Sequence, residues 1–486
     1  MNYKMIFNIT GRVLLIEAIL MLVPALVSVI YLEWTSALSF AVTLLLAALI
    51  GFLLVKLCKT TNSVMFAKEG LITVALAWIT VSIVGAVPFV ISGDIPSFID
   101  ALFETVSGFT TTGASILTDV TALSHGMLFW RSFSHWIGGM GVLVFILAVT
   151  NKSTDRSMHI LRAEMAGPTV DKVVPKARTT TMILYIIYLV MTAVLVIMLL
   201  CGGMSLYDSF IHAFGTAGTG GFGIRPDGLA SYSSYHQWVI AVFMMLFGIN
   251  FNLYFLIIVG KIGSFFKSRE LWVYIGIMLS GAVIIAFNIY SIYGSVAETI
   301  KYAFFQTSSI MTTTGFATAD FNTWPTLAKT VLVMLMFIGG MAGSTAGGFK
   351  VSRVIILFKK IGNDLKRTLH PNTMTVVKFE GKKVDESTIN GVASYTAIYA
   401  LLILVVFFLL SLDPGINPAT AIETNFSATV ACINNIGPGL GEIGPMSSYA
   451  VYSPFSKIVL SIAMLLGRLE IYPLLLTLNP MTWIKK

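Results

Sequence analysis

Charged side chains are scarce in this sequence. Asp, Glu, Lys and Arg make up 11% of its 486 residues, whereas 56% are hydrophobic and the mean hydropathy is +0.86. Typical soluble domains have about a quarter of their residues charged. The composition therefore excludes an ordinary soluble globular protein and predicts an integral membrane protein.

Cysteines and the motifs of enzymes are also scarce. The three cysteines, Cys58, Cys201 and Cys432, have spacings that fit neither a disulfide framework nor a metal cluster. The sequence has no Walker motif and no dinucleotide-binding glycine fingerprint. It also has no serine–histidine–acid or paired-carboxylate spacing that suggests catalysis. We therefore predict that the chain is not an enzyme, carries no organic cofactor and binds no structural metal.

Long apolar stretches are abundant. Roughly ten stretches approach the ~20 residues needed to cross the hydrocarbon core, some of them with interruptions. The first has no small-residue cleavage site, so we interpret it as a retained membrane helix and not as a signal peptide. Most of the 31 Lys and Arg residues lie in alternate connections, around 56–68, 152–178, 261–269 and 350–383. The positive-inside rule then predicts a cytoplasmic N-terminus, and this placement of charge argues against a nucleic-acid partner.

Four short motifs recur at similar intervals, each between two apolar stretches. They combine hydroxyl or small residues with a closing glycine: Thr110–Gly113, Ala217–Gly220, Met311–Gly315 and Cys432–Gly437. Carbonyls from four such segments can replace the hydration shell of a cation, and glycine readily adopts the alternating backbone conformations that this requires. Small-residue packing between membrane helices is the alternative for any one motif. Four motifs in register favour an ion filter.

A short apolar segment precedes each motif. The segments 97–108, 206–215, 295–310 and 419–431 are too short to cross a membrane, so we predict four re-entrant half-helices that share one cavity. Their C-terminal ends carry partial negative charge, which favours a cation. Four acidic residues near the outer mouth either raise the local cation concentration or are simply solvated loop carboxylates: Asp119, Asp227, Asp320 and Glu442.

These patterns predict an all-α integral membrane protein. Four repeats of outer helix, pore half-helix and inner helix surround one pore in a pseudo-fourfold arrangement, and a two-helix hairpin precedes them. The predicted units are the N-terminal hairpin at 1–60, repeat 1 at 69–150, repeat 2 at 180–265, repeat 3 with a broken inner helix at 270–360, and repeat 4 at 388–480.

The inner helices carry glycine-rich segments, of which 339–348 is the richest. Because consecutive glycines destabilise a helix, we predict an intramembrane loop below the filter in preference to a close-packed glycine face. Arg468 places a guanidinium within the apolar run 458–478. Charged groups at membrane depth usually face a cavity or a partner. We place Arg468 on the permeation path in contact with the loop, with a salt bridge to another helix as the alternative.

Two titratable residues share one face of the first inner helix. Arg131 and His135 are four residues apart, and Glu104 on the first half-helix is the predicted partner of Arg131. We predict a structural clamp that holds the first loop. A direct role in ion or proton transfer is the alternative.

Together these motifs resemble the TrkH/KtrB superfamily of potassium transporters. The resemblance rests on Ser107–Gly113, Trp136–Gly141, Arg162–Pro168, Gly343–Gly348 and Asn435–Gly439, and it covers nearly the whole chain. Its length and N-terminal hairpin make the chain more similar to the TrkH branch than to the KtrB branch. The resemblance implies a homodimer in the bacterial cytoplasmic membrane, surrounded by lipid, with one pore in each subunit. It also implies cytoplasmic TrkA-type regulatory subunits that bind a nucleotide and control opening.

The resemblance further implies the residues of the ion pathway. Potassium would be bound by a selectivity filter of Thr111, Thr112, Gly113, Thr219, Gly220, Gly221, Thr313, Thr314, Gly315, Asn435, Ile436 and Gly437. The gate would consist of Gly343, Ser344, Thr345, Ala346, Gly347, Gly348 and Arg468. Serine at the first filter glycine accompanies sodium transport in plant relatives, so Gly113 favours potassium. The fourth loop departs from the pattern, because Asn434, Asn435 and Ile436 precede its glycine.

Potassium uptake through a gated, selective pore is therefore the leading function. A sodium- or proton-coupled symporter with alternating access is the alternative. Such carriers usually have inverted repeats and carboxylates at the membrane midplane, whereas the four repeats here share one orientation and their motifs lack carboxylates. A membrane enzyme is disfavoured because no catalytic constellation is present.

Overall fold

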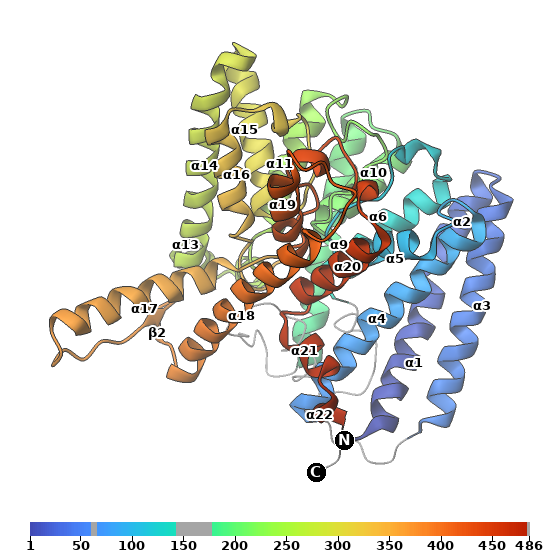
Figure 1. The fold of residues 1–486 in the computed structure, drawn as a ribbon, viewed down its shortest axis with the longest axis horizontal. Coiled ribbons are helices and arrows are strands. Elements are labelled where there is room, and N and C mark those ends of the chain that lie inside the picture. The colour runs from blue at the N-terminus through green and yellow to red at the C-terminus, as the bar shows by residue number, and fades with distance from the viewer. Residues whose placement is uncertain (60–65, 142–176, 484–486) are drawn as a thin grey trace.

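The computed structural model describes residues 1–59, 66–141 and 177–483, which are almost entirely helical (Figure 1). The basic connection around 152–178 lies largely outside these residues, and the Arg162–Pro168 motif lies wholly outside them. Six described helices are each long and apolar enough to cross a membrane. They are the helices of an N-terminal hairpin and four later helices that each precede a half-helix.

The N-terminal hairpin is formed by α1 (Tyr3–Leu20), α2 (Leu22–Ile30) and α3 (Trp34–Leu57). Gly11 and Gly51 lie at its crossing, where a Cβ on either one would come within 2.9 Å of the other's carbonyl oxygen. Small residues let the two helix backbones approach closely in a membrane. The hairpin packs against α4 and lies at one side of the molecule (Figure 1).

The rest of the chain repeats one pattern four times. The outer helices are α4 (Ala67–Ser92), α9 (Ala177–Cys201), α14 (Arg269–Tyr293) and α18 (Glu386–Leu410). The half-helices are α5 (Phe98–Phe109), α10 (Leu206–Ala217), α15 (Val296–Met311) and α19 (Ala421–Ile433), close to the predicted segments. The inner helices begin with α6 (His125–Gly139), α11 (Ser234–Phe247), α16 (Thr326–Met336) and α20 (Pro454–Arg468). Short 3₁₀ turns lie at Val120–Ala122, Phe321–Thr323, Gly441–Ile443 and Tyr449–Val451.

Each half-helix starts with favourable chemistry for a helix N-terminus. An acidic residue lies in the first turn of all four: Asp100, Asp208, Glu298 and Glu423. A carboxylate there interacts favourably with the positive end of the helix dipole. The negative ends of the half-helices consequently lead into the four glycine motifs.

The inner helices are more broken than the sequence predicts. We expected a break in the third, and it is present, because a non-helical segment separates α16 from α17 (Val351–Leu369). The second also bends, by 91° between α11 and α12 (Phe251–Ile258), and α13 (Ile262–Lys267) follows. The fourth breaks after α20, where Glu470 and Ile471 have positive φ before α21 (Tyr472–Leu478). The sequence analysis assigned a break only to the third inner helix.

The third repeat ends in a protrusion. Helix α17 runs away from the bundle, followed by the two-stranded hairpin β1 (Lys378–Phe379) and β2 (Lys382–Lys383) and by α18, which returns (Figure 1). At the chain ends, the Tyr3 hydroxyl donates a hydrogen bond to the carbonyl oxygen of Trp483 in α22 (Pro480–Trp483). Both ends of the described chain therefore lie next to each other.

Candidate functional site

The four half-helices end in the same backbone conformation. Three residues beyond the end of each half-helix, a backbone N–H donates to the carbonyl oxygen five residues earlier, at 2.8–2.9 Å: Thr112 to Ser107, Gly220 to Gly215, Thr314 to Ser309 and Ile436 to Ala431. The residue before each donor is left-handed, with φ between 55° and 57°: Thr111, Thr219, Thr313 and Asn435. A non-glycine residue in this conformation costs on the order of 1–3 kcal/mol, and such strain clusters at functional sites.

This repeated pattern corrects the register of the second loop. The sequence motif pairs Gly220 with Gly113, Gly315 and Gly437. In the structure, Gly220 instead corresponds to Thr112, and Gly221 is the equivalent glycine. Gly113, Gly221, Gly315 and Gly437 have φ of 79°, 79°, 82° and 97°. The error arose because the second loop contains adjacent glycines, and only the backbone geometry distinguishes them.

The four loops form a closed ring. A Cβ added to each of these glycines would collide with a carbonyl oxygen of the next loop: at Gly113 with Gly220, at Gly221 with Thr314, at Gly315 with Ile436 and at Gly437 with Thr112. Each loop thus abuts the next, and the fourth abuts the first. Only glycine allows this approach, because its left-handed backbone has no side chain to displace the neighbouring carbonyl. We call residues 111–113, 219–221, 313–315 and 435–437 the filter ring.

The glycine end of the filter ring opens into a cavity of about 250 Å³. Gly113, Gly221, Gly315 and Gly437 all line it, together with Arg131 and Arg225. None of its lining residues in the described chain is acidic.

The four acidic residues expected near this mouth bond to their own loops or to adjacent ones. Asp119 accepts from Thr121, Asp227 from Ser231, Asp320 from Asn322 and Glu442 from Thr420. Since none of them lines the cavity, the simpler interpretation, that they are loop carboxylates, fits the structure better.

The other end of the filter ring is covered by the glycine-rich loop between α16 and α17, which we call the gate loop (337–350). The N–H of Gly347 donates to the Thr313 hydroxyl at 2.6 Å. A Cβ on Gly347 would lie 2.8 Å from the carbonyl oxygen of Asn434 and 3.1 Å from the Cβ of Asn435. The gate loop therefore contacts the inner edge of the filter ring directly.

Arg468 binds the gate loop at the end of α20. Its guanidinium donates to the carbonyl oxygen of Thr345 at 3.1 Å and to those of Gly138 and Gly139 at 2.5 and 2.9 Å. The predicted contact between Arg468 and the loop is present. The hydrogen bonds join the third inner segment to the ends of the first and fourth inner helices.

Further charged groups bind the gate loop or lie next to it. The Lys350 ammonium donates to the carbonyl oxygen of Ala346, and Glu270 at the start of α14 accepts from the N–H of Ala342 at 3.0 Å. One turn beyond the loop, Arg353 forms an ion pair with Glu470. The gate loop and Arg468 also line a small cavity of about 60 Å³.

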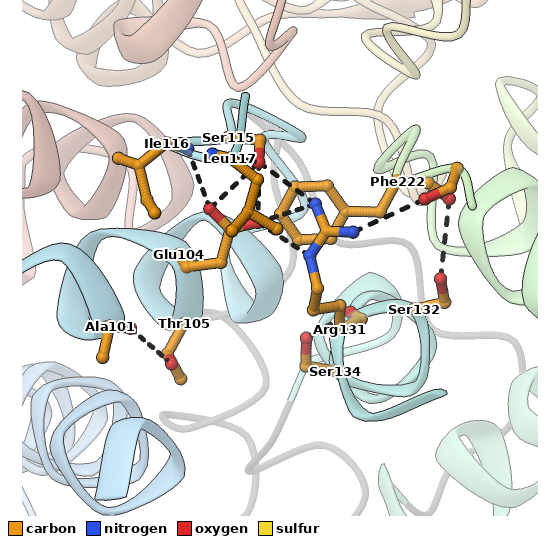
Figure 2. Close-up of polar contacts among 11 residues, drawn as sticks. Ala101, Glu104, Thr105, Ser115, Ile116, Leu117, Arg131, Ser132, Ser134 and Phe222 are labelled. Atoms are coloured by element: carbon orange, nitrogen blue, oxygen red, sulfur yellow. Dashed lines mark hydrogen bonds and ion pairs between the residues drawn. The ribbon is translucent and has the colours of Figure 1, made fainter. Parts of the chain in front are cut away.

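The predicted partnership between Arg131 and Glu104 is confirmed. Figure 2 shows the Arg131 side chain of α6 and the Glu104 side chain of α5 pointing toward each other, and their charged groups lie 2.7 Å apart with both side chains buried. Glu104 also accepts from the Ser115 hydroxyl and the Ile116 N–H just beyond the first loop. Arg131 reaches the second loop as well, by donating to the carbonyl oxygen of Gly223 at 3.4 Å. The pair thus clamps two filter loops.

Breaking this clamp tests its structural role. Replacing Arg131 with alanine leaves Glu104 buried without its partner, which we expect to destabilise the protein by about 3–5 kcal/mol. Lys329→Ala is the matched control, because the Lys329–Glu423 pair has 25% and 44% of its side chains exposed and should contribute at most about 1 kcal/mol. Thermal denaturation of the purified proteins in detergent measures both. Equal shifts in melting temperature would contradict the clamp.

The fourth loop adopts the common conformation with different side chains. Asn435 takes the threonine position, and its amide donates to the Thr112 hydroxyl and to the carbonyl oxygen of Met464, both at 2.9 Å. The Tyr449 hydroxyl donates to the carbonyl oxygen of Gly437 at 2.6 Å. Our sequence reasoning missed Tyr449, and no motif marks it.

Two ion pairs that join neighbouring repeats were also missed. Lys457 of α20 pairs with Asp100 of α5 at 2.6 Å, and so joins the fourth repeat to the first. Lys329 of α16 and Glu423 of α19 join the third repeat to the fourth in the same way, at 3.3 Å. Lysines within apolar runs need partners in a membrane, and this signal was available in the sequence.

Known proteins match nearly the whole length of this chain. The sequence profile of the TrkH family, described as "Cation transport protein", matches residues 38–274 and 283–483. The chain is 34% identical to the "Trk system potassium uptake protein TrkH" of Salmonella typhimurium over 490 residues, which covers 99% of this chain and 100% of that protein. It is 32% identical to the "Trk system potassium uptake protein TrkG" of Escherichia coli over 491 residues, which covers 99% of each chain.

The fold also agrees with a solved structure. The crystal structure of the potassium transporter TrkH from Vibrio parahaemolyticus superposes with a TM-score of 0.88 at 30% identity, and the match covers 100% of both chains. The predicted fold class, an all-helical multi-pass membrane protein with re-entrant half-helices, is confirmed by this match. The chain belongs to the TrkH family of cation transport proteins.

Proposed function

We propose that the protein takes up potassium across the bacterial cytoplasmic membrane through one gated pore. The observation that carries this proposal is the closed filter ring, in which four left-handed turns bring backbone carbonyls around one axis. Carbonyl rings of this kind replace the hydration shell of an alkali cation. The relatives are named as potassium uptake proteins of the Trk system, which agrees with potassium as the transported ion. As members of a transport family, these proteins are not enzymes.

In this proposal, the filter ring binds potassium and the gate loop controls its passage. Gly343 to Gly348 and Arg468 form the gate, because they close the inner edge of the ring and are held by hydrogen bonds that can break without unfolding a helix. The same proposal includes the division of the chain into five units: a hairpin at 1–60 and repeats at 69–150, 180–265, 270–360 and 388–480.

The partners and orientation follow from the same reasoning. We propose a homodimer with a cytoplasmic N-terminus and with TrkA-type nucleotide-binding subunits on the cytoplasmic side. The basic residues of α17 and of β1–β2 support that side for the protrusion, since positive charge accumulates in cytoplasmic segments.

Rubidium uptake by purified protein in vesicles tests the proposal. With an inside-negative potential and neither a sodium nor a pH gradient, we expect rubidium to accumulate. A tenfold excess of sodium should compete only weakly, which requires a selectivity for rubidium well above tenfold, or more than about 1.4 kcal/mol. Vesicles without protein are the control. Accumulation only when a sodium or pH gradient is imposed would favour the symporter instead.

A further inference from the structure

We propose that His135 is a positioning residue for ion selection, because its imidazole takes the place of side chains that the second filter loop lacks. The part of this inference that concerns selectivity rests on the proposed function. The packing of His135 against the second loop does not.

The second loop lacks the internal support found in the first and third. In the first loop the hydroxyls of Thr110 and Thr112 are hydrogen-bonded at 2.8 Å, and in the third loop those of Thr312 and Thr314 are bonded at 2.8 Å. These hydroxyl pairs connect the end of the half-helix to the middle of the filter segment. The corresponding residues of the second loop are Gly218 and Gly220, which have no side chains to form such a pair.

Backbone conformation does not require glycine at these two positions. Gly218 and Gly220 are absent from the residues with positive φ, and their counterparts in the other loops are threonine, asparagine or isoleucine. Space is the reason instead. A Cβ on Gly220 would overlap the imidazole ring of His135, and a Cβ on Gly218 would overlap the His135 carbonyl oxygen.

His135 is held firmly in this position. It is fully buried in α6, and its ring stacks on Phe222 of the second loop with 4.2 Å between ring centroids and 21° between planes. The guanidinium of Arg131, one turn earlier on α6, lies 4.1 Å from the Phe222 ring centroid. Arg131 is in turn fixed by Glu104, and Figure 2 shows Phe222 beside this pair. The first inner helix thus holds the second filter loop at Gly218, Gly220 and Phe222.

The other repeats provide an internal comparison. Gly138 and Gly467 are equivalent, because a Cβ on either would overlap the last carbonyl oxygen of its own half-helix, at Phe109 and Ile433. Gly139 and Gly248 are equivalent, because each faces the first residue after the next half-helix. The shared Gly-Gly-Met sequence aligns the third inner helix with the first. The residues that correspond to His135 are then all fully buried methionines: Met244, Met336 and Met464.

The pairing between inner helix and filter is therefore of two kinds. By this equivalence, three inner helices place a methionine opposite a loop with threonine or isoleucine at the middle filter position, and the first places histidine opposite glycine. The imidazole contacts the second loop through van der Waals packing, against the position of a Cβ on Gly220 and on the ring of Phe222. A flat ring against a bare glycine keeps the second filter segment in the position that a threonine side chain secures elsewhere.

An exchange of residues tests this inference. The variants are Gly220→Thr, His135→Met and the double variant, which gives the first boundary the residues of the other three. We expect Gly220→Thr alone to lower the rubidium-to-sodium uptake ratio at least tenfold, because the added side chain collides with the ring. His135→Met should lower the ratio severalfold, because the flexible side chain leaves Gly220 unsupported. The double variant should recover most of the wild-type ratio.

Thermal denaturation of the same four proteins provides a readout that is independent of transport. Coupled residues give melting-temperature shifts that do not add, so the double variant should be more stable than Gly220→Thr alone. The inference would be overturned if the double variant had neither a higher rubidium-to-sodium uptake ratio nor a higher melting temperature than Gly220→Thr. Recovery of stability without rubidium uptake by any variant or the wild type would instead support the pairing and contradict the proposed function.

Discussion

Replacing Gly113 with serine is expected to lower the selectivity of the pore for rubidium over sodium by at least about tenfold, or 1.4 kcal/mol. Gly113 has a φ of 79°, and a Cβ at this position would collide with the carbonyl oxygen of Gly220 in the next loop. The serine must therefore displace one of the carbonyls that surround the ion in the proposed function. A wider, less regular ring discriminates less between cations, which competition by sodium in a rubidium uptake assay measures.

Gly93→Ser is the matched control for this substitution. Gly93 at the end of α4 has a φ of 83°, but no heavy atom lies within 4 Å of the position of its Cβ. Serine there should cost about 1–2 kcal/mol of stability through backbone strain alone and leave ion preference unchanged. Unchanged selectivity in Gly113→Ser would show that the first filter segment is misplaced.

Replacing Arg468 with alanine is expected to raise rubidium flux about 10- to 100-fold in the absence of any regulatory partner. The guanidinium makes hydrogen bonds to three carbonyl oxygens, one in the gate loop and two at the end of α6. Hydrogen bonds from a charged group contribute about 1.5–3 kcal/mol each. Loss of part of this energy shifts the gate loop toward open states by one to two orders of magnitude. Flux into vesicles under a membrane potential measures the change.

Two further variants make this result specific to the gate. Shortening the segment 339–348 should raise flux in the same direction, because it removes the obstruction itself. Arg12→Ala removes an exposed guanidinium of α1, which donates a hydrogen bond to Asn8 one turn away, and should leave flux unchanged. Unchanged or lower flux in Arg468→Ala, with normal elution of the purified protein, would contradict the gate.

The sequence predicted the elements that depend on local pattern. Hydropathy located the half-helices, because an apolar segment of 10 to 16 residues before a glycine motif is too short to cross the membrane and must therefore enter and return. The Arg131–Glu104 pair and the contact of Arg468 with the gate loop were predictable for a related reason. Charges at membrane depth need partners, and few candidates exist.

Features that depend on packing between distant segments were not predictable. Gly220 and Gly221 are adjacent glycines, and only the hydrogen bond from Gly220 to Gly215 assigns the register of the second loop. The bend between α11 and α12 follows a single glycine, Gly248. Single glycines also occur in continuous membrane helices, so Gly248 does not by itself predict a bend. The contact of His135 with Gly220 joins residues from different repeats, and nothing in either local sequence pairs the two.

The filter ring is tested most directly by locating a heavy alkali cation in it. Anomalous scattering from crystals grown in rubidium should show ordered peaks on the axis enclosed by residues 111–113, 219–221, 313–315 and 435–437, within coordination distance of their carbonyl oxygens. Rubidium peaks only outside this ring, in protein that transports rubidium, would contradict it.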